Sequence, residues 1–311
     1  METYTKINTL YKRYAFDPKT CPEKKWLGFR NKIILGDFSD KTAEYLFRCP
    51  WEAYSKIDGT NSKICYYPGT GELKVGGKTD SANSMHGQFE MLQKIGDRIK
   101  PILAELFPPE SAKYVPTKEG NKPIYYEVWS KPLESDPTCS QAIFDKKESI
   151  SGEGMYGVKL EESPIYIYGE YFGVGIQKGG GRYFKDHNEF HVFDIHQQGW
   201  WIPKEMRDDL CTKLSLQTVP FLGIMTLEEI EEKVKSGFTT SIEGVSDSSL
   251  IEEGIVARPT LPLLDSRGNR IIVKVKYCDY IEYQNIRSQF TEEEFSEFQK
   301  WYKSEAIILS K

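Results

Sequence analysis

The chain has 311 residues, of which 39% are hydrophobic and 28% are charged, the proportions of an ordinary soluble globular protein. It has no run of about 18 apolar residues and no signal peptide, so neither membrane insertion nor export is expected. Its six cysteines are scattered without C-x-x-C pairs, which argues against a zinc site or a disulfide framework and favours a cytoplasmic protein. The net charge of −5 does not by itself indicate nucleic-acid binding.

The predicted secondary structure mixes strands and helices without a strict strand–helix–strand alternation. Runs rich in β-branched and aromatic residues predict strands, and apolar residues at helical spacing predict helices. The expected strands cover residues 63–67, 124–129, 165–172, 190–195, 254–258 and 271–277, and the expected helices cover 87–107, 204–214, 227–236 and 292–303. This order predicts an α+β fold of largely antiparallel sheets flanked by helices.

The chain is expected to form one main domain with a short tail. We assign residues 1–280 to that domain, with an irregular insertion around 108–155 that is rich in Pro, Gly, Ser and charged residues. Residues 281–311 form a helical extension in which Phe295, Phe298 and Trp301 or Tyr302 share one face.

The most informative run is K-I-D-G-T-N, from Lys56 to Asn61, after an aromatic, strand-like stretch around Trp51 and Tyr54. It suggests an amine at the end of a strand where the backbone turns sharply, since glycine permits unusual dihedral angles and Asp and Asn bond locally. Nucleophilic amines need such placement, but an isolated K-x-D-G is usually an ordinary surface turn.

Four further signals follow in chain order. The first is Tyr168-Gly169-Glu170, which places a carboxylate at the end of a β-rich run, and the second is the aromatic strand F-H-V-F-D-I at 190–195. The third is E-E-G-I-V-A-R at 252–258. The fourth is Lys274-Val275-Lys276, whose lysines occupy alternate strand positions and point to one face.

These residue types suit the handling of a nucleotide. A lysine can attack phosphorus, carboxylates can hold a divalent metal, paired lysines can neutralise phosphates, and an aromatic ring can stack on a base. Basic residues also cluster around Lys178–Lys185 and 267–276, although each cluster alone could be an ordinary solvated face. No G-x-x-x-x-G-K-[ST] motif is present, and Gly179–Gly181 lacks the G-x-G-x-x-G spacing, which disfavours a P-loop or dinucleotide fold.

The ordered set K-x-D-G, G-E, F-D, E-G-x-V-x-R and K-x-K resembles the covalent nucleotidyltransferases, that is, polynucleotide ligases and mRNA-capping guanylyltransferases. Residues 168–195 are most similar to the nick-sealing phage-type RNA ligases of the RNA ligase 2 family. The resemblance covers roughly residues 30 to 280. It implies a nucleotidyltransferase (ATP-grasp-like ligase) fold and makes residues 1–280 an adenylyltransferase domain.

The resemblance also implies the residues that carry the chemistry. Lys56 is expected to be the nucleophile that takes AMP from ATP, after losing its proton with the help of nearby positive charge. Lys274 and Lys276 are expected to grip the α-phosphate. Glu253 is expected to bind the catalytic Mg²⁺ or Mn²⁺.

A second group of residues is expected to bind the nucleotide. Glu170 contacts the ribose or orients the site, and Phe193 stacks on adenine. Phe190 is the alternative stacking ring, on the argument that alternate strand positions face the same way. The other expected nucleotide-binding residues are Asp58, Gly59 and Lys78.

The expected partner is RNA with 3′-OH and 5′-phosphate ends. Asn61, Lys178 and Arg182 are the candidate nucleic-acid contacts. We expect a monomeric, ATP-dependent RNA ligase that works through lysyl-AMP and adenylated-RNA intermediates, with RNA repair as its role. The alternatives are a minimal DNA ligase, a capping-type guanylyltransferase, or a non-catalytic nucleotide- or RNA-binding relative.

Each assignment also has a purely structural alternative. The carboxylates Glu170 and Glu253 could be solvated strand ends, Phe193 could be core, and the two lysines of K-x-K could form an exposed strand face. Glu127 competes with Glu170 on local pattern but lacks the preceding glycine.

Three departures from the family pattern stand out. Ser55 precedes the lysine where many such RNA ligases have glutamate, and Lys78 replaces the usual arginine, which weakens the case for bidentate phosphate recognition there. Only residues 277–311 follow Lys276, too few for the OB-fold of DNA ligases and capping enzymes. The short helical tail therefore favours RNA as the substrate.

Overall fold

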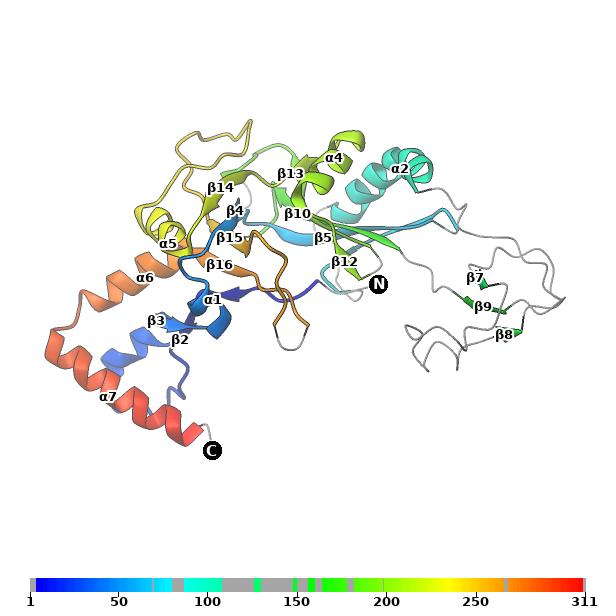
Figure 1. Ribbon diagram of the computed structural model, residues 1–311. Coiled ribbons are helices and arrows are strands. Elements are labelled where there is room, and N and C mark those ends of the chain that lie inside the picture. The colour runs from blue at the N-terminus through cyan, green and yellow to red at the C-terminus, as the bar shows by residue number, and fades with distance from the viewer. Residues whose placement is uncertain are drawn as a thin grey trace. The chain divides into compact units, whose positions relative to one another are not determined.

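The computed structural model describes residues 4–68, 70–79, 87–107, 126–129, 148–149, 156–159, 164–177, 182–197, 199–265 and 268–309 (Figure 1). The chain divides into two compact units. Unit 1 comprises Met1–Tyr4, Thr60–Tyr171 and Asn188–Thr218, and unit 2 comprises Thr5–Gly59, Phe172–His187 and Val219–Lys311.

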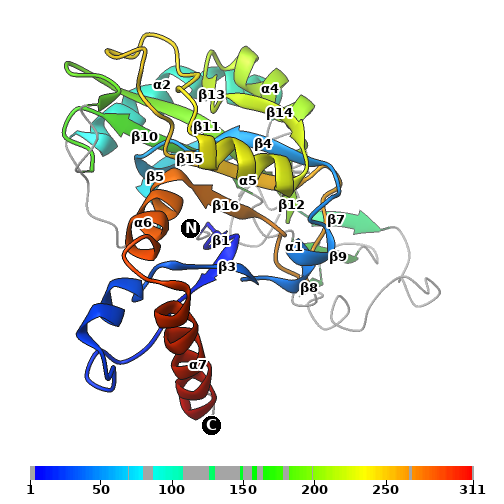
Figure 2. The ribbon, with the colours of Figure 1, turned by 90° about the vertical axis from the view of Figure 1, so that its left-hand side faces the viewer.

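Unit 2 is built on a five-stranded sheet. Its strand order is β1 (Asn8–Thr9), β16 (Val273–Lys276), β15 (Gly254–Pro259), β4 (Trp51–Ser55) and β14 (Phe221–Met225). Only the β1–β16 pair is parallel. Helices α5 (Leu227–Ser236) and α6 (Tyr277–Arg287) contact this sheet, and Figure 2 shows α5 running across β15 and β16. The buried core between them includes Trp51, Ile230, Val234, Ile255 and Val275.

The rest of unit 2 is built from residues near the start and the end of the chain. It includes the antiparallel pair β2 (Tyr11–Arg13) and β3 (Ile33–Phe38), the 3-10 helix η1 (Lys24–Phe29), α1 (Lys41–Tyr45) and α7 (Glu292–Leu309). Tyr14, Phe16, Phe29, Phe290 and Phe298 form a buried group that we call the aromatic cluster. The rings of Phe29 and Phe298 stack with centroids 4.5 Å apart, so α7 packs directly against residues near the start of the chain.

Unit 1 contains a second, mainly antiparallel sheet. Its strand order is β12 (Trp200–Trp201), β11 (Asn188–Gln197), β10 (Ile165–Gly173), β5 (Thr60–Tyr67) and β6 (Glu72–Gly77), and β13 (Gln217–Thr218) pairs with β11 in parallel. Helix α2 (Gln88–Leu106) packs on β5 and β6, and α4 (Lys204–Lys213) packs on β11 and β13. A separate three-stranded sheet has the order β7 (Tyr126–Trp129), β9 (Tyr156–Lys159), β8 (Glu148–Ser149).

The predicted α+β fold with mainly antiparallel sheets is confirmed. Thr226 caps α5 in a capping box with Glu229, and α7 begins at Glu292 as expected. The expected strand at 271–277 is shorter, because Tyr277 already belongs to α6, which the strand prediction missed. Residues 277–309 form two helices and no strand, so no OB-fold lies in this stretch.

Two expectations stay predictions. Most of the insertion expected around 108–155 lies outside the described residues, apart from β7 and β8. The division at residue 280 falls within α6 and also stays a prediction. None of the helices in the described ranges is both long and apolar enough to cross a bilayer.

Candidate active site

Lys56 lies directly after β4, the strand between β15 and β14 in the sheet of unit 2. Its backbone N–H donates to the carbonyl oxygen of Gly254 at 2.9 Å, which extends the β4–β15 ladder by one residue. The chain then turns through residues 57–59 and enters β5 at Thr60. The backbone of the lysine is therefore fixed by the sheet while its side chain leaves at the strand end.

The side chain of Lys56 forms an ion pair with Glu253, the residue before β15. Lys56 Nζ donates to Glu253 Oε2 at 2.5 Å, and Lys276 Nζ lies 2.6 Å from Glu253 Oε1. One largely buried carboxylate thus bridges two lysines. Burial alone would raise the pKa of Glu253, but the two ammonium groups outweigh burial and lower it, so this carboxylate is ionised at neutral pH.

Lys274 and Lys276 alternate along β16 with the buried residues Val273 and Val275, so both lysines point to one face as predicted. Burial alone would lower the pKa of Lys276, but the hydrogen bond to Glu253 raises it. Burial and then the charges of Lys276 and Lys56 lower the pKa of Lys274. Within the described part of the chain Lys274 has no carboxylate partner. The ammonium groups of Lys276 and Lys56 act on Lys274, and such a concentration of positive charge favours binding of an anionic ligand.

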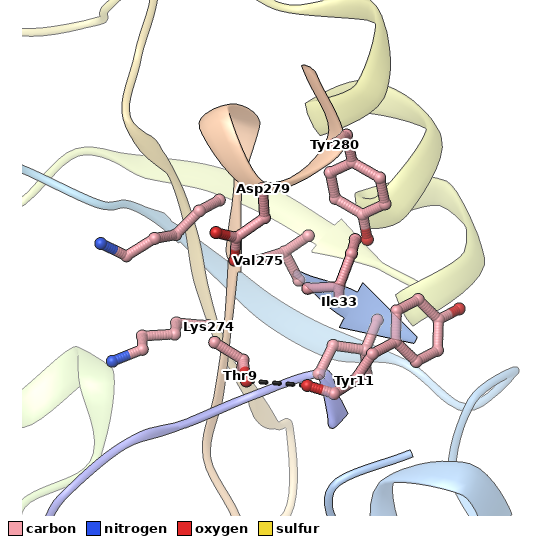
Figure 3. Close-up of a pocket in the computed structure, with 9 residues that line it drawn as sticks. Thr9, Tyr11, Ile33, Lys274, Val275, Asp279 and Tyr280 are labelled. Atoms are coloured by element: carbon pink, nitrogen blue, oxygen red, sulfur yellow. Dashed lines mark hydrogen bonds between the residues drawn. The ribbon is translucent and has the colours of Figure 1, made fainter. Parts of the chain in front are cut away.

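A small hollow lies beside β16. Figure 3 shows Lys274 at its edge, with Thr9, Tyr11, Asp279 and Tyr280 among the other lining residues. Asp279 is buried and paired with Arg13 at 2.5 Å. The electrostatic influence of Arg13 extends to Lys274, whose pKa it helps to lower.

The turn after Lys56 is bonded to residues of 172–187, which also belong to unit 2. The backbone N–H of Asp58 donates to Tyr183 Oη at 3.0 Å, and Gln177 Nε2 donates to the carbonyl oxygen of Gly59 at 3.0 Å. Arg182 Nη2 lies 4.0 Å from Asp58 Oδ2 and donates to Tyr183 Oη at 3.1 Å. Neither Tyr183 nor Gln177 was predicted from the sequence. Hydrogen bonds between residues more than a hundred positions apart leave no local sequence pattern.

The remaining candidates with described positions lie in unit 1. Glu170 on β10 pairs directly with Asn61 on β5, and the Oδ1 atom of Asn61 is buried without a hydrogen bond. Phe193 on β11 is half-buried, with its ring edge-on to Tyr4 at 5.0 Å. Lys78 is exposed just after β6. Lys178 lies outside the described residues.

Phe190 and Phe193 do not share a face of β11, contrary to the sequence-based expectation. The two residues are three positions apart, so their side chains leave opposite faces of β11. Phe190 is buried against Gly169, where a Cβ atom would lie 2.4 Å from its ring. The glycine before Glu170 therefore makes room for Phe190, and Phe193 is the more accessible of the two rings.

The described residues contain no cluster of three or more side chains ready to hold a metal ion. A divalent cation would have to combine Glu253 with ligands from a substrate. Mg²⁺ commonly binds in this way, through one or two carboxylates, substrate phosphates and retained waters. The ionised carboxylate of Glu253 has the chemistry for this role, but a cation would have to displace Lys56 or Lys276 from one of its oxygens.

In this site a strand-end lysine is paired with a carboxylate and accompanied by two further lysines. A family model described as RNA ligase matches residues 50–276, which contain all of these residues. The chain belongs to the RNA ligase family.

Solved structures similar to this chain include forms of Naegleria gruberi RNA ligase. A lysine-to-alanine mutant with ATP and manganese is 14% identical, with a TM-score of 0.45, and the match covers 79% of this chain and 55% of that one. The form with pyrophosphate is 15% identical, with a TM-score of 0.44 and the same coverage. This chain thus matches just over half the length of those proteins. No match was found among curated proteins.

Proposed function

We propose that this protein is an ATP-dependent RNA ligase that joins 3′-OH and 5′-phosphate ends and acts in RNA repair. The observation that carries the proposal is the group formed by Lys56, Glu253, Lys274 and Lys276 in one unit of a chain of the RNA ligase family. It supplies a nucleophile, a cation-binding carboxylate and an anion-binding pair side by side. ATP and Mg²⁺ or Mn²⁺ are the proposed cofactors.

In the first step the neutral amine of Lys56 attacks the α-phosphorus of ATP. A nitrogen–phosphorus bond forms, the bond to the β-phosphate oxygen breaks, and pyrophosphate leaves with its electron pair, while the ammonium proton goes to solvent. Lys274, which has no carboxylate of its own in the described structure, is proposed to bind the α-phosphate as its charge develops.

Before attack, Lys56 must leave its pairing with Glu253 and lose a proton. Glu253 is the residue that would hold the divalent cation, and a bound cation would supply positive charge that stabilises the phosphates. Because the same carboxylate bonds Lys56 and Lys276, either lysine can serve as its partner when the other is engaged with phosphate.

In the second step a 5′-phosphate oxygen of RNA attacks the phosphorus of lysyl-AMP, and the amine of Lys56 leaves and regains a proton. In the third step the 3′-hydroxyl attacks the 5′-phosphate phosphorus of the adenylated end, and AMP departs. Phe193 and Glu170 are proposed to bind the adenosine, with Asp58, Gly59 and Lys78 as further nucleotide contacts. Asn61, Arg182 and Lys178 are proposed to contact RNA.

The test is a sealing assay on a nicked RNA duplex with a labelled 5′-phosphate, in the presence of ATP and Mg²⁺. We expect a joined product whose label resists phosphatase, together with release of pyrophosphate and AMP. Binding of ATP without pyrophosphate release would instead identify a non-catalytic relative. Replacing ATP by GTP, and the RNA nick by a DNA nick, separates the proposal from a guanylyltransferase and a DNA ligase. A panel of nicked, stem-loop and single-stranded ends identifies the preferred substrate.

A further inference from the structure

Residues 57–59, which follow Lys56, form two hydrogen bonds with a single loop of the chain. This connection, between β10 and β11, is described for residues 174–177 and 182–187, and it belongs to unit 2 together with the turn. Tyr183 accepts the N–H of Asp58, and Gln177 donates to the carbonyl of Gly59. With the bond from the N–H of Lys56 to Gly254, the backbone is fixed at residues 56, 58 and 59.

Tyr183 is rigidly placed for this task. Its side chain is fully buried, its ring lies edge-on to Phe172 at 5.2 Å, and its carbonyl oxygen accepts the N–H of Ser246 at 2.8 Å. Its hydroxyl oxygen accepts from both the Asp58 N–H and Arg182 Nη2. Burial raises the pKa of Tyr183 to about 12, so the hydroxyl remains neutral throughout the physiological pH range.

Arg182 adds a second link to the same turn. Its guanidinium lies between the hydroxyl of Tyr183 and the carboxylate of Asp58, and its neighbourhood includes Glu252, a buried carboxyl. The position of the turn therefore depends on a small polar network rather than on the sheet alone. A shift of the turn would redirect the side chain of Lys56, and reacting groups lose much of their rate when misplaced by about 1 Å.

We infer that Tyr183 is a positioning residue for Lys56, which it orients through the backbone of Asp58, with Gln177 acting in the same way on Gly59. This inference rests on the proposed function, since it concerns the step in which Lys56 attacks ATP. Tyr183 does not touch the reacting atoms. Its loss affects the attack by Lys56 and leaves later steps that do not use this amine as nucleophile largely intact.

The test compares Tyr183→Phe with wild type in two single-turnover reactions: formation of lysyl-AMP from ATP, and sealing of RNA supplied with an already adenylated 5′ end. In Tyr183→Phe the rate of lysyl-AMP formation falls about tenfold, the effect of losing one orienting hydrogen bond. The ATP concentration for half-maximal rate stays the same, and sealing of pre-adenylated RNA stays within about twofold of wild type.

Two other variants complete the design. Tyr302→Phe removes the same kind of bond, from the backbone N–H of Ala15 to a phenol oxygen beside the aromatic cluster, and is expected to leave both reactions unchanged. Gln177→Glu replaces an exposed amide, which donates a hydrogen bond, by a carboxylate that cannot donate one. If Tyr183→Phe fails to fold, this variant tests the inference in its place. Wild-type lysyl-AMP formation in both Tyr183→Phe and Gln177→Glu, or an equal fall in both reactions, overturns the inference. Failure of the wild type to form lysyl-AMP overturns the proposed function and the inference with it.

Discussion

Lys56 is constrained at both its backbone and its side chain. The backbone N–H extends the ladder to β15, and the ammonium group pairs with Glu253. In this state the amine is a paired cation rather than a nucleophile. The carboxylate proposed to hold the metal therefore also holds the lysine proposed to attack.

Glu252, the neighbour of Glu253, has a contrasting environment. Only 1% of Glu252 is exposed, and both carboxyl oxygens are buried without a hydrogen bond. Burial raises its pKa above the usual 4.5, although Thr240, Ser55 and Arg182 act in the other direction. The pKa values of two adjacent carboxyl groups are thus shifted in opposite directions, because Glu253 has lysine partners and Glu252 is buried without one.

Replacing Glu252 by Gln is expected to stabilise the protein progressively as the pH rises. An acid with a raised folded-state pKa contributes its full stability below about pH 4.5 and loses it as the pH rises through the folded pKa. Gln has no such loss. The difference in free energy of unfolding between Glu252→Gln and wild type should therefore grow in favour of the variant above pH 4.5, as measured by urea unfolding. A difference that is constant with pH would show that folding does not raise the pKa of Glu252.

At this scale the residues proposed to carry chemistry could be selected from the sequence, whereas the residues proposed to position them could not. Lys56, Glu253, Lys274 and Lys276 lie in short motifs, and the structure brings all four together. Tyr183 carries no such pattern, because its role arises from a bond to Asp58 that only the folded chain creates. Which of the two rings, Phe190 or Phe193, is the more accessible was likewise visible only in the folded structure.

At the scale of elements, the site depends on the close approach of β15 and β16. Gly254 opens β15 with φ of +157°, and a Cβ there would lie 2.0 Å from the carbonyl oxygen of Val275. A side chain would have to push the two strands apart at the point where Glu253 and Lys276 meet. The glycine of the E-G motif is thus required by packing between strands.

Gly254→Ala is accordingly expected to destabilise the fold by about 3 kcal/mol and to lower lysyl-AMP formation at least tenfold. Gly268→Ala is the matched control, because Gly268 also has a positive φ but faces open space, and it should cost only about 1 kcal/mol. Thermal unfolding and the adduct assay measure both effects. Equal effects of the two substitutions would show that backbone conformation, and not the contact with Val275, explains the glycine.

Helix α7 is the element with the clearest stabilising role. Phe298 is fully buried in the aromatic cluster and stacks on Phe29. Phe298→Ala should cost about 3–5 kcal/mol, whereas Glu297→Ala, one residue earlier and exposed, should change stability by less than about 0.5 kcal/mol. Denaturant midpoints decide this, and a small loss for Phe298→Ala would mean that α7 contributes little to the fold.

The elements themselves were largely predictable. Alternating or continuous apolar runs located β5, β10, β11 and β15, and Thr226 marked the start of α5. Helix α6 was not predicted, because the strand pattern of β16 continues into Tyr277 without a break. Tyr277 and Tyr280 lie in this helix and pack on the core. The pairing order within each sheet involves contacts between distant residues, so local patterns do not determine it.

At the scale of the whole molecule, the family match from residue 50 to 276 runs through both compact units. Unit 2 contains the lysine group and the turn-positioning residues, and unit 1 carries Glu170, Asn61 and Phe193. The α+β class could be inferred from the sequence. The division into two units could not, because each unit is assembled from separate stretches of the chain.

The central claim is that Lys56 becomes covalently linked to AMP. The most direct measurement is intact-mass and peptide mass spectrometry of the protein after incubation with ATP and Mg²⁺, on wild type and on Lys56→Ala, with the folded state of both checked by circular dichroism. We predict a mass increase of one AMP in the wild type, located on the peptide that contains Lys56, and no increase in a folded Lys56→Ala variant. AMP attached at normal yield to Lys56→Ala would contradict the claim.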